Sequence, residues 1–294
     1  MVKYINILGL LLLLLCMACK EQLVEINKFS QENGIGLVGE INQMDTVIVA
    51  LVNTGNLITG MEAEPIDNAE ISLLNQDNDI ISAFFYSTFN KWNASLLPKI
   101  KMGDKYTIQA KVNGVELSAT TQIPPLIKAR IVKNEKVDNG FNIEIEIENS
   151  NVQEALCTVE LLSYADEVSE NYENISSRSF TRILLNTDDQ KTDNIKYNEL
   201  TIDYEKIFLP IKANNTSLLH LNVSEDNINA NTHYCFWIKS LEKTYYQYVY
   251  GYELQKSQIL EDALLQVQTV DNIKNGIGIW GGCYKVELGV DLFK

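Results

Sequence analysis

The side chains best suited to nucleophilic or metal chemistry are scarce in this sequence. His233 and Cys235 are two residues apart in an apolar stretch, so on a strand they would share a face. A Cys–His nucleophile needs its base beside the thiol, which two positions on one strand do not readily provide. A zinc site needs further ligands, and the only other histidine, His220, lies in a separate alternating stretch. We interpret residues 234–237 as core and His220 as structural.

Asn75, Asp77 and Asp79 have the spacing of the first, third and fifth ligands of a calcium loop. Ile80 stands where that loop needs glycine, and no glutamate occupies the twelfth position. Asn and Asp also form turns directly, so we predict a hairpin turn here.

Two other acidic patterns deserve the same comparison. Glu144, Glu146 and Glu148 alternate with isoleucines and indicate a solvated strand face, because like charges this close repel one another. Acidic residues between 188 and 193 lie in a polar stretch that we predict to be a loop. Weak calcium binding by this loop is an alternative to simple solvation.

A glycine motif near the end of the chain matches G-x-G-x-x-G. It comprises Gly276, Gly278 and Gly281, with Trp280 inside it. A dinucleotide site needs a helix after the motif and an acid about 20 residues further on, whereas the thirteen residues that follow read as a strand. We therefore assign these four residues a structural role, with Trp280 packed inward or across a neighbouring backbone.

No other sequence pattern argues for an enzyme. The chain has no G-x-S-x-G elbow and no H-E-x-x-H motif, and its many carboxylates single out no pair. We assign no catalytic residue, metal or cofactor, and an envelope hydrolase with an unrecognised site stays an alternative.

The amino-acid composition limits which classes of partner the protein can bind. The 294 residues are 46% hydrophobic and carry a formal net charge of −15, which suits a globular chain and excludes a nucleic-acid binder. Cys157, Cys235 and Cys283 are an odd number at long spacings, so one disulfide at most can form among them. We predict three buried thiols that pack as small hydrophobic groups.

Apolar and polar residues alternate with a period of two along most of the chain, which predicts strands as the elements that carry the candidate residues. Strands are predicted at 37–41, 46–52, 69–74, 80–81, 106–112 and 115–120, with a type I′ hairpin at Asn113-Gly114. After Pro124-Pro125 come further strands at 141–148, 155–163, 179–185, 217–223 and 232–240. The fold class is therefore mainly β, with two consecutive immunoglobulin- or fibronectin-like sandwich regions at 35–124 and 125–294.

The second region ends with two elements of a different kind. The tyrosine-rich stretch 245–254 fits either a strand or a helix, and helix-forming residues after it favour a helix over about 245–262. A glycine-rich strand is predicted at about 276–288. We expect this strand to pair with the second sandwich and the helix to cover it.

The N-terminus resembles a bacterial lipoprotein signal. Lys3 precedes an apolar run over 5–15, and Ala18-Cys19 follows. Residues 1–18 are then a signal peptide, Cys19 is the lipidated first residue of the mature chain, and 19–34 is a polar tether. Its alternative is a plain secretory peptide cut after Ala18.

Motifs along nearly the whole chain resemble the domain-of-unknown-function 4249 family of Bacteroidetes lipoproteins. The matching stretches are Ala18-Cys19, 37–41, 66–71, 105–108, 121–124, 245–248, 254–255 and 272–281. The resemblance implies a lipid-anchored outer-membrane protein, on either the periplasmic or the cell-surface side. It also implies a non-enzymatic accessory or binding subunit beside a TonB-dependent transporter. A structural or adhesive surface lipoprotein is the alternative.

Overall fold

The computed structural model describes most of the chain from Gly34 onward. The described residues are 34–44, 46–54, 64–66, 68–86, 100–164, 180–187, 189, 192, 204–229, 232–258 and 270–293. The predicted signal peptide, Cys19 and the predicted tether up to residue 33 lie outside them. Within these ranges no helix combines the length and hydrophobicity of a membrane span. The chain divides into two units, and the larger one, Ile35–Val52 with Pro65–Lys294, holds the two cores and the candidate site described below.

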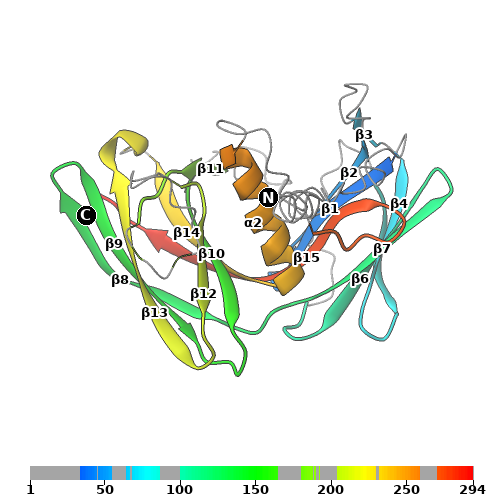
Figure 1. Cartoon of the computed structure of the whole chain (residues 1–294), viewed down its shortest axis with the longest axis horizontal. Helices are drawn as coiled ribbons and strands as arrows, with labels where there is room; N and C mark the ends of the chain where they lie inside the picture. The colour runs from blue at the N-terminus through cyan, green and yellow to red at the C-terminus, as the bar shows by residue number, and fades with distance from the viewer. Residues whose placement is uncertain are drawn as a thin grey trace, which may run out of the picture. The chain divides into compact units, whose positions relative to one another are not determined.

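The fold is mainly β, as the sequence predicts, and the described residues include one short α-helix (Figure 1). The strands are β1 (Gly34–Asn42), β2 (Thr46–Thr54), β3 (Glu64–Pro65), β4 (Ala69–Leu74), β5 (Ile80–Tyr86), β6 (Lys105–Val112), β7 (Val115–Gln122), β8 (Lys128–Val137), β9 (Gly140–Asn149), β10 (Ala155–Tyr164), β11 (Phe180–Ile183), β12 (Ile207–Ile211), β13 (Asn215–Ser224), β14 (His233–Leu241) and β15 (Ile277–Val290). A 3-10 turn, η3 (Glu225–Asn227), follows β13, and the helix is α2 (Lys243–Gln258).

The strands form three sheets. The large sheet has eight strands, in the order β11-β10-β14-β15-β1-β2-β3 with β12 also paired to β10. A sheet of β13-β9-β8 and a sheet of β5-β4-β6-β7 pack against it. The large sheet therefore takes strands from both predicted sandwich regions.

Local sequence explains the hairpins. Asn113 and Gly114 both have positive φ, 49° and 82°, as the predicted type I′ turn between β6 and β7 requires. Between β4 and β5, the Asn75 side-chain oxygen accepts hydrogen bonds from the backbone N–H groups of Asp77 and Asp79, each at 2.9 Å. The predicted hairpin turn is confirmed, and the side chains of the calcium-like pattern serve it.

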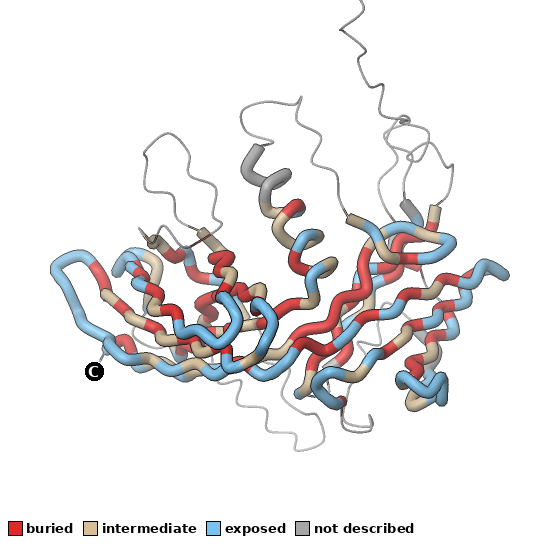
Figure 2. Tube along the Cα trace, turned by 60° about the horizontal axis from the view of Figure 1, so that its bottom comes forward, coloured by how far each residue is buried: buried red, intermediate tan, exposed pale blue. Residues whose placement is uncertain are grey.

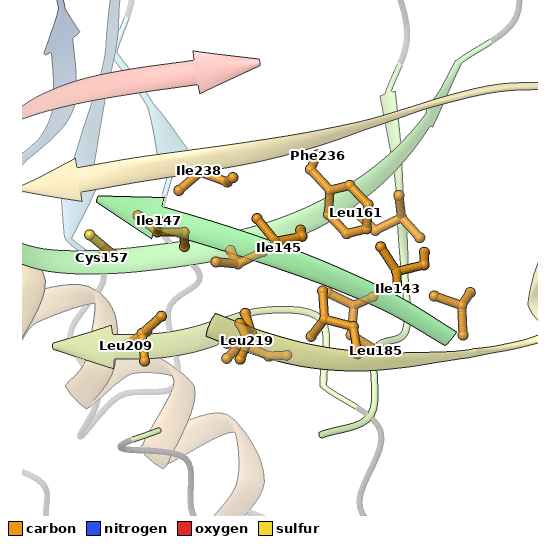
Figure 3. Packing of buried hydrophobic residues seen from close by; sticks show 14 of the residues in the cluster. Ile143, Ile145, Ile147, Cys157, Leu161, Leu185, Leu209, Leu219, Phe236 and Ile238 are labelled. Carbon is orange, nitrogen blue, oxygen red and sulfur yellow. The ribbon is translucent and has the colours of Figure 1, made fainter. Parts of the chain in front are cut away.

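One core lies between the β13-β9-β8 sheet and the C-terminal part of the large sheet. Its members include Ile143, Ile145 and Ile147 of β9, with Cys157, Leu161, Phe236 and Ile238 facing them (Figure 3). The prediction that the isoleucines and glutamates of β9 point to opposite faces is confirmed, because the isoleucines are fully buried. Glu146 and Glu148 face the neighbouring strand β8, where Arg130 and Lys128 pair with them at 2.7 and 3.3 Å.

A second core joins the β5-β4-β6-β7 sheet to β1 and β2. It contains Leu37, Ile41, Leu73 and Ile108, together with Trp280 from the far end of the chain. Figure 2 shows the underlying alternation, with buried and exposed positions following one another along many strands.

Strand β15 connects the two cores. Its first half, Ile277 to Cys283, runs parallel to β1, and its second half, Cys283 to Val290, runs antiparallel to β14. In Figure 1 it is the long red arrow between these two strands. The expected pairing with the second sandwich is present, and the parallel pairing with β1 is an addition that the sequence analysis did not predict.

Candidate ligand-binding face

The outward face of the large sheet displays the polar and aromatic side chains with potential for binding. On β10 and β14 the residues 157, 159, 161, 234, 236 and 238 point into the core. Because side chains alternate along a strand, Glu160, Leu162 and Tyr164 of β10 and Trp237 of β14 point the other way. Phe180 and Arg182 of β11 share this face, since Tyr164 pairs with Phe180 and Leu162 with Arg182.

Four aromatic rings form an arc on this face. His233 stacks on Tyr164 with ring centroids 5.5 Å apart, and Tyr164 meets Phe180 edge-on at 5.5 Å. Phe180 then reaches the Trp237 ring at 4.7 Å. The arc surrounds Leu162, which is buried, and all four rings keep some exposure to solvent.

The Phe180–Trp237 end of the arc borders a shallow depression of about 470 Å³. Its lining residues are Glu160, Leu162, Phe180, Thr181, Arg182, Glu205 and Trp237. An apolar floor with a few convergent polar groups is the usual composition of a small-molecule site.

A compensated carboxylate lies at the edge of this depression. Only 4% of the Glu160 side chain is exposed, and its carboxylate accepts a hydrogen bond from Arg182 Nε at 2.9 Å and faces Lys206 Nζ at 3.6 Å. Burial alone would raise the pKa of Glu160, but the cations Lys206, Lys239 and Arg182 outweigh it and lower the pKa. Glu160 is therefore a carboxylate at neutral pH.

Arg182 has donors to spare for a ligand. Half of its side chain is exposed, and its hydrogen bond to Glu160, within the described part of the chain, uses Nε. A guanidinium has five N–H donors in a planar fork, so four remain. The depression thus offers directed donors next to two aromatic rings.

Trp237 is held in place from its other side. Its indole N–H donates to Glu287 at 3.1 Å, and Lys285 Nζ lies 4.1 Å from the ring centroid. Lys285 does not line the depression, so this cation–π contact braces the ring on the side away from it. Burial and the nearby Lys239 lower the pKa of Lys285.

A buried ion pair lies on the same outward face, under the start of helix α2. Lys239 Nζ of β14 donates to both carboxylate oxygens of Glu40 of β1, at 2.8 and 3.0 Å, and the Tyr245 hydroxyl of α2 donates to the same carboxylate at 2.8 Å. Burial would raise the pKa of Glu40, but Lys239 dominates and brings it down to about 2. The pair ties β1 and α2 to β14.

The glycines of β15 allow this close packing. A Cβ added to Gly281 would lie 2.2 to 2.5 Å from ring atoms of Tyr245, and one added to Gly278 would meet the backbone of Leu37. At Gly276 the nearest group would be the Leu117 side chain. Glycine at these positions accommodates α2, β1 and β7, and the chain continues as strand to Val290 where a dinucleotide site would need a helix.

Trp280 lies on the opposite side of β15 from Tyr245. Its side chain is fully buried, and its indole N–H donates to the Tyr106 backbone carbonyl at 3.1 Å. Gly39 of β1 pairs with Trp280, and a Cβ there would be 2.8 Å from the indole. Gly39 was not predicted to have a role, although its isolated position in an apolar strand was the available signal.

The remaining candidate residues have structural partners. Cys157, Cys235 and Cys283 are buried thiols, as predicted, and burial raises the pKa of Cys157 to about 12. Asp189 accepts a hydrogen bond from the His220 backbone N–H at 2.7 Å. Asp188 and Asp193 lie outside the described residues, and no group of three metal-ligating side chains occurs among the described ones.

Sequence reasoning did not single out Glu160, Tyr164, Phe180 or Arg182. Alternation alone places Glu160 and Tyr164 on one face of β10, and Phe180 and Arg182 on one face of β11. What the sequence lacks is the register between the strands, which decides that these faces and Trp237 meet.

Comparisons with known proteins add little. No protein-family profile matches the chain, and no curated protein matches its sequence. A crystal structure of a putative carbohydrate binding protein from Bacteroides uniformis aligns with 88% of this chain and 99% of its own, at 11% identity and a TM-score of 0.23. The yeast delta-COP-I mu-homology domain with a Dsl1 peptide aligns with 87% of this chain and 96% of its own, at 9% identity and a TM-score of 0.21. Such low TM-scores support no argument about this chain.

Proposed function

We propose that this protein is a non-enzymatic, lipid-anchored binding protein of the outer membrane, and that the depression beside Trp237 binds carbohydrate. The observation that carries the binding role is the combination of two half-exposed rings, Phe180 and Trp237, with the exposed guanidinium of Arg182. A sugar ring has an apolar C–H face that packs on an aromatic ring, and hydroxyl groups that accept from guanidinium N–H groups.

Charge favours a neutral ligand. The carboxylates of Glu160 and Glu205 are matched by the cations Arg182 and Lys206, so the depression has no excess of either charge to attract an ionic ligand. The chain as a whole carries −15, which disfavours anionic ligands at long range.

The state of Glu160 does not suit the proton donor of a glycosidase. A glycosidase needs one carboxyl group whose pKa is raised so that it can protonate the leaving oxygen. Glu160 has the opposite shift, because three cations lower its pKa.

The membrane attachment and the transporter partner rest on the sequence. Lipidation of Cys19 would hold the protein at the outer membrane, and the resemblance to transporter-associated lipoproteins motivates a TonB-dependent transporter as the recipient of the ligand. In this role the protein would bind a sugar near the membrane and pass it on for uptake.

Binding is tested with the lipidated protein in detergent micelles on an array of neutral glycans. We expect Trp237→Ala and Arg182→Ala to abolish the signal that the wild type gives. Tyr252→Ala changes an exposed tyrosine of α2 that is not among the lining residues; it is the matched control and should bind as wild type. A wild type that binds no glycan would refute the carbohydrate function.

The attachment has a separate test. Cys19→Ala should move the protein from the membrane fraction to the soluble fraction, because the acyl chains supply the membrane affinity. Cys16→Ser is the control and should leave the fractionation unchanged. A Cys19→Ala protein that still sediments with outer membranes would contradict the lipoprotein assignment without touching the binding function.

A further inference from the structure

The aromatic arc extends well beyond the depression. Tyr164 and His233 stack on one another but line no part of the depression, which ends at Phe180 and Trp237. On β14, His233 and Trp237 are four residues apart, which corresponds to about 13 Å along a strand. The two outermost rings of the arc, His233 and Trp237, therefore stand on strand positions farther apart than the length of one sugar ring, with Tyr164 and Phe180 between them.

The two ends belong to one continuous surface. Tyr164 pairs with His233 on one side and with Phe180 on the other, so all three rings lie in one row across β14, β10 and β11. The Phe180 ring also contacts the Trp237 ring, which lies outside that row. A ligand lying along β10 and β14 would contact the Trp237 end and the Tyr164–His233 end together.

We infer that the Tyr164–His233 pair is a second sugar subsite, and that the face is built for an oligosaccharide chain rather than for a monosaccharide. The inference rests on the proposed carbohydrate function and specifies the length of the ligand. The Trp237 end, with the donors of Arg182, holds one sugar unit. The Tyr164–His233 end receives a unit further along the same chain by ring stacking.

The residue types at the two ends fit this division. The guanidinium N–H groups of Arg182 provide hydrogen-bond donors at the Trp237 end, which orient a ligand. The second end presents an exposed imidazole beside a half-buried phenol, and such rings add contact area with weaker directional demands. Loss of the second end should therefore weaken long ligands and spare short ones.

The test is calorimetric titration of the lipidated protein in micelles with neutral oligosaccharides from starch, cellulose, xylan and mannan, each graded from monosaccharide to hexasaccharide. For the series that binds, we expect affinity to rise at least tenfold between the disaccharide and the hexasaccharide. Tyr164→Ala should lower hexasaccharide affinity about tenfold, as expected for one lost aromatic contact, and leave disaccharide affinity unchanged.

Two more variants separate a loss of the second subsite from a general loss of folding or binding. His233→Ala alters an exposed side chain and should reproduce the length-dependent loss if Tyr164→Ala proves unstable. Trp237→Ala should weaken every length. A wild type with equal affinity for short and long chains, or a Tyr164→Ala loss that is the same at every length, would overturn the second subsite while leaving the carbohydrate function in place. Failure of every series to bind would overturn both.

Discussion

The two halves of β15 differ in how many of their faces are covered by other elements. Between Ile277 and Cys283 the strand is pressed from both faces, by Tyr245 on one side and by β7 and the Trp280 pocket on the other, and it is rich in glycine. Between Tyr284 and Val290 one face packs into the core while Lys285 and Glu287 point outward to support Trp237. The first half, Ile277 to Cys283, is the closed half, where glycine makes room for the elements that contact both faces. The second half, Tyr284 to Val290, is the open half, where side chains alternate because one face of the strand is open.

Removal of the whole strand should have the largest effect. Truncation after Asp271 deletes the strand that lies between β1 and β14 and removes Trp280 from the second core. We expect the product to aggregate or lack a cooperative transition, because both neighbours lose their ladder and apolar surface is exposed. Circular dichroism melts and size-exclusion chromatography measure this. A truncated monomer that melts like the intact protein would show that β15 is a dispensable tail.

The variants Trp280→Ala and Trp237→Ala compare a tryptophan in the closed half of β15 with one on the outward face of the large sheet. The buried indole should cost about 3–5 kcal/mol of unfolding free energy when it is removed, because a large cavity is left and a hydrogen bond to Tyr106 is lost. Trp237→Ala removes the same side chain from a half-exposed site and should cost less than half as much. Denaturant melts of the two variants decide the comparison, and equal losses would contradict it.

The Glu40–Lys239 pair at the junction of the halves predicts a pH dependence. The pKa of Glu40 falls from about 4.5 to about 2 on folding, so its contribution is present above pH 4.5 and is lost as the pH falls toward 2. The shift corresponds to about 3 kcal/mol. Wild type and Glu40→Gln should therefore differ most at neutral pH and converge in acid. A difference that does not shrink between pH 4.5 and pH 2 would rule out this linkage.

A pair of glycine substitutions gives the finest comparison. Gly281→Ala would place a methyl group against the Tyr245 ring and should cost about 1–3 kcal/mol. Gly289→Ala, in the open half, meets nothing within 4 Å and should change stability by less than about 0.5 kcal/mol. Thermal melts of both variants suffice. If Gly289→Ala proved the more damaging, the closed and open halves would be wrongly assigned.

Local pattern was enough to place many of the elements. The β9 alternation, the Asn113-Gly114 turn and the helix after residue 243 follow from side-chain period and turn chemistry, which depend on near neighbours. Three strands escaped prediction for equally local reasons. β3 is two residues long and includes Pro65. β8 is charged and has an irregular register between Ile131 and Lys133, and β12 is five residues long with Pro210 inside it.

What the sequence by itself determined is which residues prefer strands, which thiols are too apolar in context to be exposed, and that three glycines around Trp280 require close neighbours. Only the tertiary structure decided which elements those neighbours belong to. β1 and β15 pair although they lie at opposite ends of the described chain, and Glu40 meets Lys239 across 199 residues of sequence. Cross-strand register likewise brings Phe180 to Trp237. Strand preference is a property of a few adjacent residues, whereas pairing depends on the burial and hydrogen bonding of the whole sheet, so no local pattern could specify the ligand-binding face.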